Sequence, residues 1–535
     1  MSVYDLESGY IFIFYGENVR LKWEKMLAEA LISHFGDSLI MRDLTEDVLK
    51  YAFNWNANRL IELLNHQKEL RFYQALFLLH EFSCHFTSRY PRESPIPQME
   101  LQDFALYRRV LKLCLEHACE LSLNSNNPFA FSYLSEIDES MEDIFCLGFQ
   151  AYYFSFYLAE EKMCKGTIMV KNDEESGITF ERVAIFQFLQ SEMKAETSNL
   201  LYRVSDVNAC TDFVRALKEC FEINYEHIAQ AIWLIHDHNK DVGGQMVLCN
   251  WSLFPKVLEE LCGVPYDKCA LFFKGLTLDR HNKLALKDAI RTPGSLDRYL
   301  YRPILVFDVN GKPMAILGEA AFDQAIISLW ANALGWGKYP LEWKNRCFDN
   351  YVKTKVEENS NILEDSIENL FKENNIVYDR NLKFLRKPNN RNRDINHVPG
   401  EVDFIFIYDK VVYIADSKYA LQRFDMNYYK NDYSNFVNIY NEKLSRRITF
   451  FSKHKDELEQ HFQVLLQDKD FSLNDFRVEG LFIVNSPTYI GKLNEYRIIT
   501  LFELLTIFGK TPNYRSYEIS ITPKGRLNLN IFYHD

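Results

Sequence analysis

Hydrophobic residues recur at helical spacing through the first half of this chain. From residue 1 to about residue 290, leucine, phenylalanine and alanine return every three or four positions, as in 59–86 and 104–123, which is the spacing of one helix face. Strands are fewer there, and one is predicted over 10–15. The segment 91–97, with three prolines, predicts a loop that divides two helical layers. We therefore expect residues 1–290 to be mainly α-helical.

Turn signals mark the end of this helical region. Residues 302–307 and 314–318 are apolar runs on either side of an Asn-Gly pair, which is a strong signal for a tight hairpin, and a helix is predicted after it. Farther along, short runs of β-branched and aromatic residues alternate with helical segments. The pattern predicts a multidomain chain, with a connecting hairpin and helix over 291–345 and an α/β domain over 346–535.

The sharpest pattern lies in residues 400–419, which read GEVDFIFIYDKVVYIADSKY. Two apolar, β-branched and aromatic runs are separated only by an Asp-Lys pair, and this predicts a tight hairpin. A turn centred on that pair places Asp403 opposite Asp416 and Glu401 opposite Lys418. Because side chains alternate between the two faces of a strand, all four polar side chains should project from the same face.

Two carboxylates that face each other across a ladder repel, so we expect a cation between them. A hard divalent cation such as Mg²⁺ prefers oxygen ligands and is often held by one or two carboxylates, with waters and phosphate oxygens completing its shell. Carboxylates, a metal and a neighbouring lysine suit phosphodiester hydrolysis. The alternative is an ordinary solvent-facing edge hairpin with a salt bridge.

The segments around the hairpin predict a layered domain. A helix is predicted over 361–371, with Ser360 or Asn361 as its cap. One or two amphipathic helices are predicted over 433–462, followed by a buried strand over 478–485 and a helix over 500–508. The predicted order is helix, strand, strand, helix, strand, helix.

With these residues in place, 346–510 resembles the PD-(D/E)XK nuclease superfamily, which has the restriction-endonuclease-like fold. Asp403 matches the first Asp of the motif, Asp416-Ser417-Lys418 matches (D/E)-x-K, and Glu364 matches the acid of the preceding helix; Val402 stands where the motif has proline. The resemblance implies a C-terminal α/β restriction-endonuclease-like domain with a central mixed sheet.

The resemblance also implies roles for these residues. Mg²⁺, or alternatively Mn²⁺, would be bound by Asp403, Asp416 and the backbone carbonyl of Ser417. Lys418 would position or help to activate the attacking water, and Glu364 would hold a metal-bound water or a second ion. Glu401, on the same predicted face, would be either an additional ligand or the partner that neutralises Lys418.

A basic segment lies between the predicted helix and the hairpin. We expect its cations, together with two arginines of the following helix, to contact nucleic-acid phosphates without sequence choice and with a steep dependence on salt; these residues are Arg380, Lys383, Arg386, Lys387, Arg391, Arg393, Arg446 and Arg447. The alternative interpretation is a solvated loop.

The balance of basic and acidic residues also changes at about residue 346. The net charge is −13, residues 346–535 contain 27 basic and 27 acidic residues, and residues 1–345 contain 34 and 47. An acidic region is a poor non-specific binder of polyanions. We therefore expect nucleic acid to be handled by the C-terminal domain. The N-terminal region would serve targeting, regulation or assembly, through a protein partner or a second copy of the chain.

Other candidate functional features have less support in the sequence. His80 and His85 are five residues apart rather than the four of a zinc-protease helix, and the histidines at 227, 236 and 238 fit a polar helix end better than a metal site. The eleven cysteines are odd in number and form no CxxC pair, so we expect buried thiols in a reducing cytoplasm. No signal peptide is recognisable. The most apolar segment, 144–159, is shorter than the roughly twenty residues of a membrane span, so we expect no membrane association.

The sequence thus predicts a cytoplasmic, Mg²⁺-dependent endonuclease that acts on DNA, in bacterial restriction or antiviral defence against phage. Two alternatives remain at this point. One is a non-catalytic nucleic-acid-binding or scaffold protein with a degenerate nuclease fold, and the other is an RNase effector with the same metal chemistry.

Overall fold

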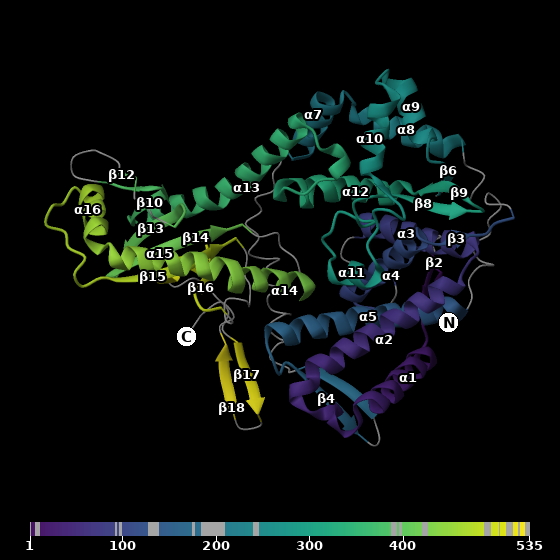
Figure 1. Cartoon of the computed structure of the whole chain (residues 1–535), viewed down its shortest axis with the longest axis horizontal. Helices are drawn as coiled ribbons and strands as arrows, with labels where there is room; N and C mark the ends of the chain where they lie inside the picture. Colours follow the sequence, from purple (N-terminus) through teal and green to yellow (C-terminus); the bar gives the residue numbers. More distant parts are fainter. Residues whose placement is uncertain are drawn as a thin grey trace. The chain divides into compact units, whose positions relative to one another are not determined.

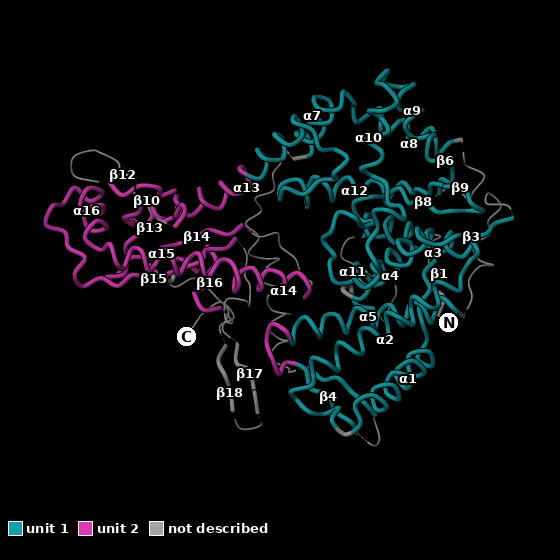
Figure 2. Tube along the Cα trace, in the orientation of Figure 1, with its two compact units in different colours: residues 1–161, 168–181, 206–356 teal, residues 162–167, 182–205, 357–535 magenta. Residues whose placement is uncertain are grey.

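The computed structural model divides the chain into two compact units, which Figure 2 shows in two colours. Unit 1 comprises residues 1–161, 168–181 and 206–356, and unit 2 comprises 162–167, 182–205 and 357–535. The structure describes residues 2–5, 11–90, 94–95, 99–126, 139–173, 177–182, 209–238, 246–386, 393–394, 399–419, 426–485, 494–501, 503–509, 517–522 and 525–529. The segment 91–97, predicted to be a dividing loop, lies largely outside these residues, and the helices before and after it belong to the same unit.

Unit 1 is mainly helical, as its sequence predicts, and has two hydrophobic cores. The first core includes Phe12, Tyr73 and Phe145, and the second surrounds Trp343, whose ring stacks on Phe272 with centroids 5.5 Å apart. The helices are α1 (Glu17–Phe35), α2 (Thr45–His66), α3 (Leu70–Arg89), α4 (Leu101–Ala118), α5 (Glu139–Met163), α7 (Ala209–Phe221), α8 (Tyr225–His238), α9 (Leu253–Cys262), α10 (Tyr266–Gly275), α11 (Leu286–Arg291) and α12 (Glu319–Asn332).

The apolar segment 144–159 lies inside α5 and contributes to the first core. Burial inside the protein explains its composition, because the inner face of the helix carries the large apolar side chains. Among the helices that the structure describes, none combines the length and the apolar composition that crossing a bilayer requires.

Short strands complete unit 1. The Asn-Gly hairpin is confirmed as β8 (Ile304–Val309) and β9 (Lys312–Leu317), and both turn residues have a positive φ, as a type I′ turn requires. In the largest sheet of this unit the strand order is β3-β8-β9-β6, and β7 also pairs with β8. The other strands are β1 (Ser2–Asp5), β2 (Ile11–Phe14), β3 (Ser122–Leu123), β4 (Ile168–Asp173), β5 (Gly177–Arg182), β6 (Val247–Asn250) and β7 (Thr277–Leu278).

One expectation about the cysteines is wrong. Cys220 in α7 and Cys347 in α13 form a disulfide, with Cα atoms 5.4 Å apart and a sequence separation of 127. Sequence spacing could not indicate this pair, because the two helices meet only in the folded unit. Six of the nine cysteines that remain free are buried, and these six agree with the prediction.

Unit 2 is built on a five-stranded mixed sheet with the order β10-β13-β14-β15-β16. The first three strands are antiparallel neighbours, and β14, β15 and β16 are parallel. Helix α13 (Arg346–Glu373) covers one face of the sheet and α15 (Asn441–Lys453) with α16 (Lys455–Leu466) the other (Figure 1). The strands are β10 (Val377–Leu382), β13 (Val402–Tyr408), β14 (Val411–Lys418), β15 (Arg477–Val484) and β16 (Arg497–Thr500).

Three predicted elements of this unit differ in the structure. The helix predicted over 361–371 is the end of the 28-residue α13, which begins at Arg346, so Ser360 and Asn361 are not caps. The helix predicted over 500–508 is only α17 (Leu504–Ile507), because Thr500 ends β16. The basic segment predicted to be a loop contains β10 and the short strands β11 (Phe384–Leu385) and β12 (Arg393–Asp394).

The connection between β14 and β15 is helical over most of its described part, up to Leu466, and non-helical from there to the start of β15. The helical part consists of α14 (Met426–Asn435), a π-helical turn η6 (Phe436–Tyr440), α15 and α16. A last hairpin, β17 (Tyr517–Thr522) and β18 (Gly525–Leu529), follows the sheet in sequence. Unit 2 is therefore a mixed α/β unit with a central mixed sheet.

Candidate active site

The predicted hairpin register is confirmed from the turn to the middle of the strands. Tyr408 pairs with Val411, and the ladder continues to Phe404 and Ala415. Asp409 and Lys410 have φ values of 43° and 58°, the left-handed conformation that a two-residue hairpin turn requires. The hairpin is not at an edge, since β10 and β15 flank it on either side. This arrangement rules out a solvent-facing edge hairpin.

The ladder ends where the two acidic residues begin. Instead of a backbone pair at this level, the Asp403 carboxylate accepts hydrogen bonds from the Ser417 backbone N–H, at 2.7 Å, and from the Ser417 hydroxyl, at 3.0 Å. The side chain of Asp403 thus takes the place of a backbone acceptor, and both of its hydrogen bonds fix it against β14.

The Lys418 ammonium lies among three oxygen atoms. Its Nζ donates to the backbone carbonyl of Ser417 at 2.9 Å and lies 3.2 Å from Asp416 Oδ2 and 3.9 Å from Asp403 Oδ2. The Asp416 side chain is only 4% exposed, and that of Lys418 is 26% exposed. These oxygens are the three that the sequence resemblance assigns to a metal ion.

Asp416 has a second cationic partner on the other side. Arg447 Nη1 of α15 donates to Asp416 Oδ1 at 2.5 Å, while Arg447 Nε donates to the backbone carbonyl of Pro399 at 3.2 Å. Gly400 has φ +86°, and a Cβ atom there would lie 3.2 Å from Arg447 Nη2. The chain before β13 therefore wraps closely around this guanidinium.

Glu364 reaches the same cluster from α13. Its Oε1 lies 3.5 Å from the Ser417 hydroxyl, which also donates to Asp403. Its Oε2 accepts from Arg380 Nε and Nη2 at 3.2 and 3.1 Å. The structure thus brings Glu364 and Asp403 together through one serine hydroxyl rather than through direct contact.

The environment of Asp403 raises its pKa to about 6. Burial is the largest cause and the negative charge of Asp416 the second, while Lys418 and the hydrogen bonds from Ser417 oppose both. The carboxylate pair therefore holds its charge at a free-energy cost, as expected for acids gathered to receive a cation.

Glu401 does not have its predicted partner. It precedes β13 and its Oε2 lies 3.1 Å from Lys383 Nζ, whereas Lys418 contacts Asp403 and Asp416. The predicted pairing of Glu401 with Lys418 is wrong because the ladder ends at Phe404 and Ala415, three residues earlier than this pair requires.

The described basic residues that were predicted to contact phosphates each have a carboxylate partner. Arg380 lies within ion-pair distance of Glu364, Asp365 and Glu368, all on α13. The remaining pairs are Lys383–Glu401 at 3.1 Å, Arg386–Asp379 at 3.1 Å, Arg446–Glu442 at 3.8 Å and Arg447–Asp416 at 2.5 Å. Lys387, Arg391 and the side chain of Arg393 lie outside the described part of the chain.

Sequence reasoning missed two contributors to the site. Ser417 was assigned only a backbone role, but its hydroxyl joins Glu364 to Asp403. The ring of Tyr440, in the π-helical turn η6, has its centroid 5.4 Å from Lys418 Nζ. π-Helical turns occur frequently at functional sites, but the local sequence does not predict this one.

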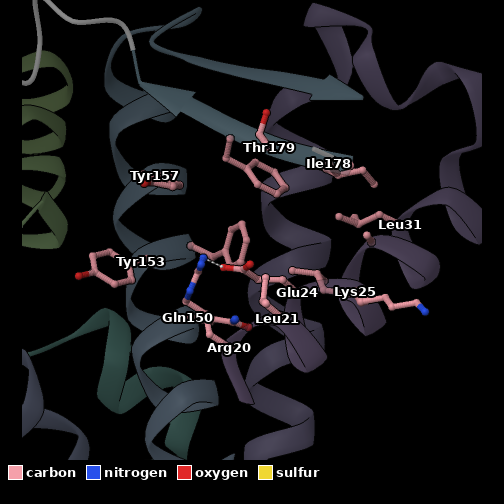
Figure 3. Close-up of a pocket in the computed structure, with 15 residues that line it drawn as sticks. Arg20, Leu21, Glu24, Lys25, Leu31, Gln150, Tyr153, Tyr157, Ile178 and Thr179 are labelled. Carbon is pink, nitrogen blue, oxygen red and sulfur yellow. Dashed lines mark hydrogen bonds and ion pairs between the residues drawn. The ribbon is translucent and has the colours of Figure 1, made fainter. Parts of the chain in front are cut away.

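A pocket lies in unit 1, between α1, α5 and β5 (Figure 3). This pocket of 740 Å³ has mainly apolar and aromatic walls, and its polar lining includes an ion pair between Arg20 and Glu24 at 2.8 Å. Lys25 points away from it in Figure 3. Its lining lacks the opposed acids beside a lysine that distinguish the site in unit 2.

One group of potential metal ligands also lies in unit 1. The ligand atoms of His80, Glu81 and Cys84 are within 4.8 Å of one another, and all three residues are buried. Glu81, however, accepts hydrogen bonds from the backbone N–H groups of Ala320 and Ala321 at the start of α12. Glu81 therefore has a structural role as a cap at the start of α12.

Comparisons of this chain with protein-family models, with curated proteins and with solved structures found no match.

Proposed function

We propose that unit 2 is a metal-dependent nuclease that hydrolyses phosphodiester bonds, with DNA as its substrate. One observation carries the proposal: Asp403, Asp416 and the Ser417 carbonyl converge on a single cationic point, between helices that cover both faces of the sheet. A degenerate scaffold has no use for buried acids that repel each other, and this favours a catalytic role over the scaffold alternative.

The donor set fits a hard divalent cation. Among the residues that the structure describes, the groups that meet at this point are oxygens, without sulfur or imidazole. Such a set suits Mg²⁺ or Mn²⁺ rather than zinc or copper. Asp403, Asp416 and the Ser417 carbonyl would hold the ion. When bound, it would lower the pKa of a coordinated water and neutralise charge on the scissile phosphate.

The protein groups around this point have separate roles in the proposed reaction. The ammonium of Lys418 donates a hydrogen bond to the attacking water or to a phosphate oxygen, and so orients one against the other. Glu364 accepts a hydrogen bond from a water on the α13 side. Arg380 keeps Glu364 oriented, because two of its nitrogens donate to the same oxygen, Oε2.

The biological setting that the resemblance implies is bacterial restriction or anti-phage defence. This step rests on analogy and not on the chemistry of the site. The acidic surplus of residues 1–345 supports a role for unit 1 in assembly or targeting rather than in binding nucleic acid directly.

The test compares three full-length proteins: the wild type, Lys418→Ala and Lys410→Ala. Lys410 is the control because it lies in the turn of the same hairpin with 70% of its side chain exposed. Each protein is incubated with duplex DNA, single-stranded DNA and RNA, in Mg²⁺, Mn²⁺ or EDTA. We expect metal-dependent cleavage of DNA by the wild type and Lys410→Ala, and a loss of at least 100-fold in Lys418→Ala.

Two other outcomes point to the alternatives. Cleavage of RNA alone would identify an RNase effector with the same residues. Binding without cleavage by all three proteins, in every metal, would favour the scaffold.

A further inference from the structure

The position of the Lys418 ammonium has a consequence for metal binding. Its Nζ contacts Ser417 O, Asp416 Oδ2 and Asp403 Oδ2 at 2.9, 3.2 and 3.9 Å. Mg²⁺ bonds to oxygen at about 2.0–2.1 Å. An ion that reached the same three oxygens would have to lie within a few ångströms of Nζ, where a positive and a doubly positive charge repel strongly in a partly buried site.

The oxygens of this cage are held by bonds that do not depend on Lys418. Arg447 takes Oδ1 of Asp416 and is itself fixed by the Pro399 carbonyl, which leaves Oδ2 directed toward the ammonium. Asp403 is fixed by the backbone N–H and hydroxyl of Ser417. The cage is therefore preorganised.

Lys418 is the member of the cluster best able to move. It has a flexible four-carbon stem, and it is more exposed than either aspartate. The ring of Tyr440, 5.4 Å from Nζ, gives the ammonium a favourable neighbouring position through a cation–π contact.

From this geometry we propose that Lys418 is an internal competitor for the divalent cation, so that metal binding displaces its ammonium from the three oxygens toward Tyr440. The inference rests on the proposed function for its metal site and adds a regulatory property to it. The lysine keeps the carboxylates neutralised when the metal is scarce and sets the metal concentration at which the site fills. Its displaced ammonium remains beside the ion, where the reaction uses it.

The inference makes a prediction that a purely catalytic lysine does not. Replacing Lys418 with methionine, which keeps the stem and removes the charge, should tighten Mn²⁺ binding by at least tenfold while it abolishes cleavage. Mn²⁺ alone is titrated into each full-length protein, and the free ion is followed by electron paramagnetic resonance. Lys418→Arg, which keeps the charge, should bind Mn²⁺ within threefold of the wild type.

Three further variants make the result decisive. Lys410→Met carries the same charge change at the exposed end of the hairpin and should leave Mn²⁺ affinity unchanged. Lys418→Gln also removes the charge but keeps a polar side chain, and it serves as the second test if Lys418→Met folds poorly. Asp416→Asn combined with Lys418→Met should abolish the gain, and this locates the ion at the cage.

The outcomes separate this inference from the proposed function. Tighter Mn²⁺ binding in Lys418→Met, lost with Asp416→Asn, supports the inference even if the wild type cleaves no substrate, in which case only the proposed activity fails. Equal or weaker binding in both Lys418→Met and Lys418→Gln, with cleavage by the wild type intact, overturns the inference alone. Binding that Asp416→Asn leaves unchanged overturns the metal site itself.

Discussion

At the scale of single residues, the site is a chain of polar contacts in which each basic side chain lies beside at least one carboxylate. Arg380, Glu364, Ser417 and Asp403 connect on one side, and Lys418, Asp416 and Arg447 on the other. The basic members stabilise the carboxylates beside them, so substitution of a basic member leaves a partly buried carboxylate without its partner. Removing one partner of a buried ion pair costs more free energy of folding than the intact pair contributes to stability.

Asp403 should make the stability of the protein depend on pH. Its pKa of about 6 in the fold exceeds the value of about 3.9 in an unfolded chain. Between these values the folded state binds more protons, so stability falls as the pH rises from about 4 to 6, and the cost of roughly 3 kcal/mol persists above pH 6. Asp403→Asn should therefore stabilise the protein by up to about 3 kcal/mol at pH 8 and by little at pH 4.

Thermal unfolding in EDTA at both pH values measures this difference. Asp409→Asn is the matched control, because it makes the same change in the exposed turn of the hairpin and should have the same small effect at either pH. A gain for Asp403→Asn that does not vary with pH would contradict the explanation.

Arg447 and Arg446 are adjacent in sequence but differ in what they contact. Arg447→Met should destabilise the protein by about 3 kcal/mol, because it leaves the buried Asp416 carboxylate without its guanidinium. Arg446 is 58% exposed and lies 3.8 Å from Glu442, so Arg446→Met should change stability by less than about 0.5 kcal/mol. Urea unfolding at pH 7.5 compares the two, and equal effects would show that Arg447 is not a buried partner of Asp416.

At the scale of elements, the site depends on how closely α15 approaches the sheet. Gly480 in β15 makes this approach possible, because a Cβ atom there would lie 2.4 Å from Ile448 Cδ1 and 3.0 Å from Leu444 Cδ2. Arg447 follows Arg446 on the same helix and reaches Asp416 on the neighbouring strand β14. The spacing of helix and sheet therefore positions the guanidinium.

Gly480→Ala should push α15 away from the sheet and cost about 1–3 kcal/mol through overpacking. It should also weaken metal binding, since Asp416 loses part of its support. Adding Ile448→Val removes the Cδ1 atom that the new methyl group meets, so the double variant should regain most of the stability. Urea unfolding of the two variants checks this, and a double variant as unstable as Gly480→Ala would show that the contact is not the cause.

The sequence predicted the hairpin correctly but gave a loop where the structure has strand β10, and both results have the same physical reason. The hairpin has continuous apolar runs and a turn with strong local preferences, so its register follows from neighbouring residues alone. Strand β10 carries Asp379 and Arg380 in its middle, and such charges are typical of a loop. They are tolerated because α13 supplies Glu364 and Glu368 to Arg380, and Arg386 pairs with Asp379.

Local sequence does not show which distant residues meet in the fold, and this explains the other differences between prediction and structure. The partners of Arg447, the disulfide between Cys220 and Cys347, and the position of Lys418 all depend on residues that are distant in sequence or on the end of a ladder. Periodicity reports only which face of an element is apolar. It therefore located the acids and the lysine but could not show that the lysine lies among the proposed metal ligands.

At the scale of the whole molecule, charge determines how the protein should meet nucleic acid. The chain carries −13 overall, and the described basic residues near the site are paired with carboxylates. Paired cations release few counterions when a phosphate approaches, and the net charge repels a polyanion. Binding should therefore depend less on salt than the six cations of the basic segment would imply if all were free.

This expectation is quantitative. Six phosphate contacts would give a slope of log Kobs against log salt of about −5, while contacts from Lys387, Arg391 and Arg393 alone would give about −3. Replacing Arg391 and Arg393 together with alanine should reduce the slope by about 2 units. Replacing Arg380 and Arg386 should leave it unchanged, because Glu364 and Asp379 already neutralise them. Fluorescence anisotropy with a duplex of fixed length, in EDTA to prevent cleavage, measures all three slopes, and a wild-type slope of −5 that Arg380→Ala and Arg386→Ala reduce would show that nucleic acid breaks these ion pairs.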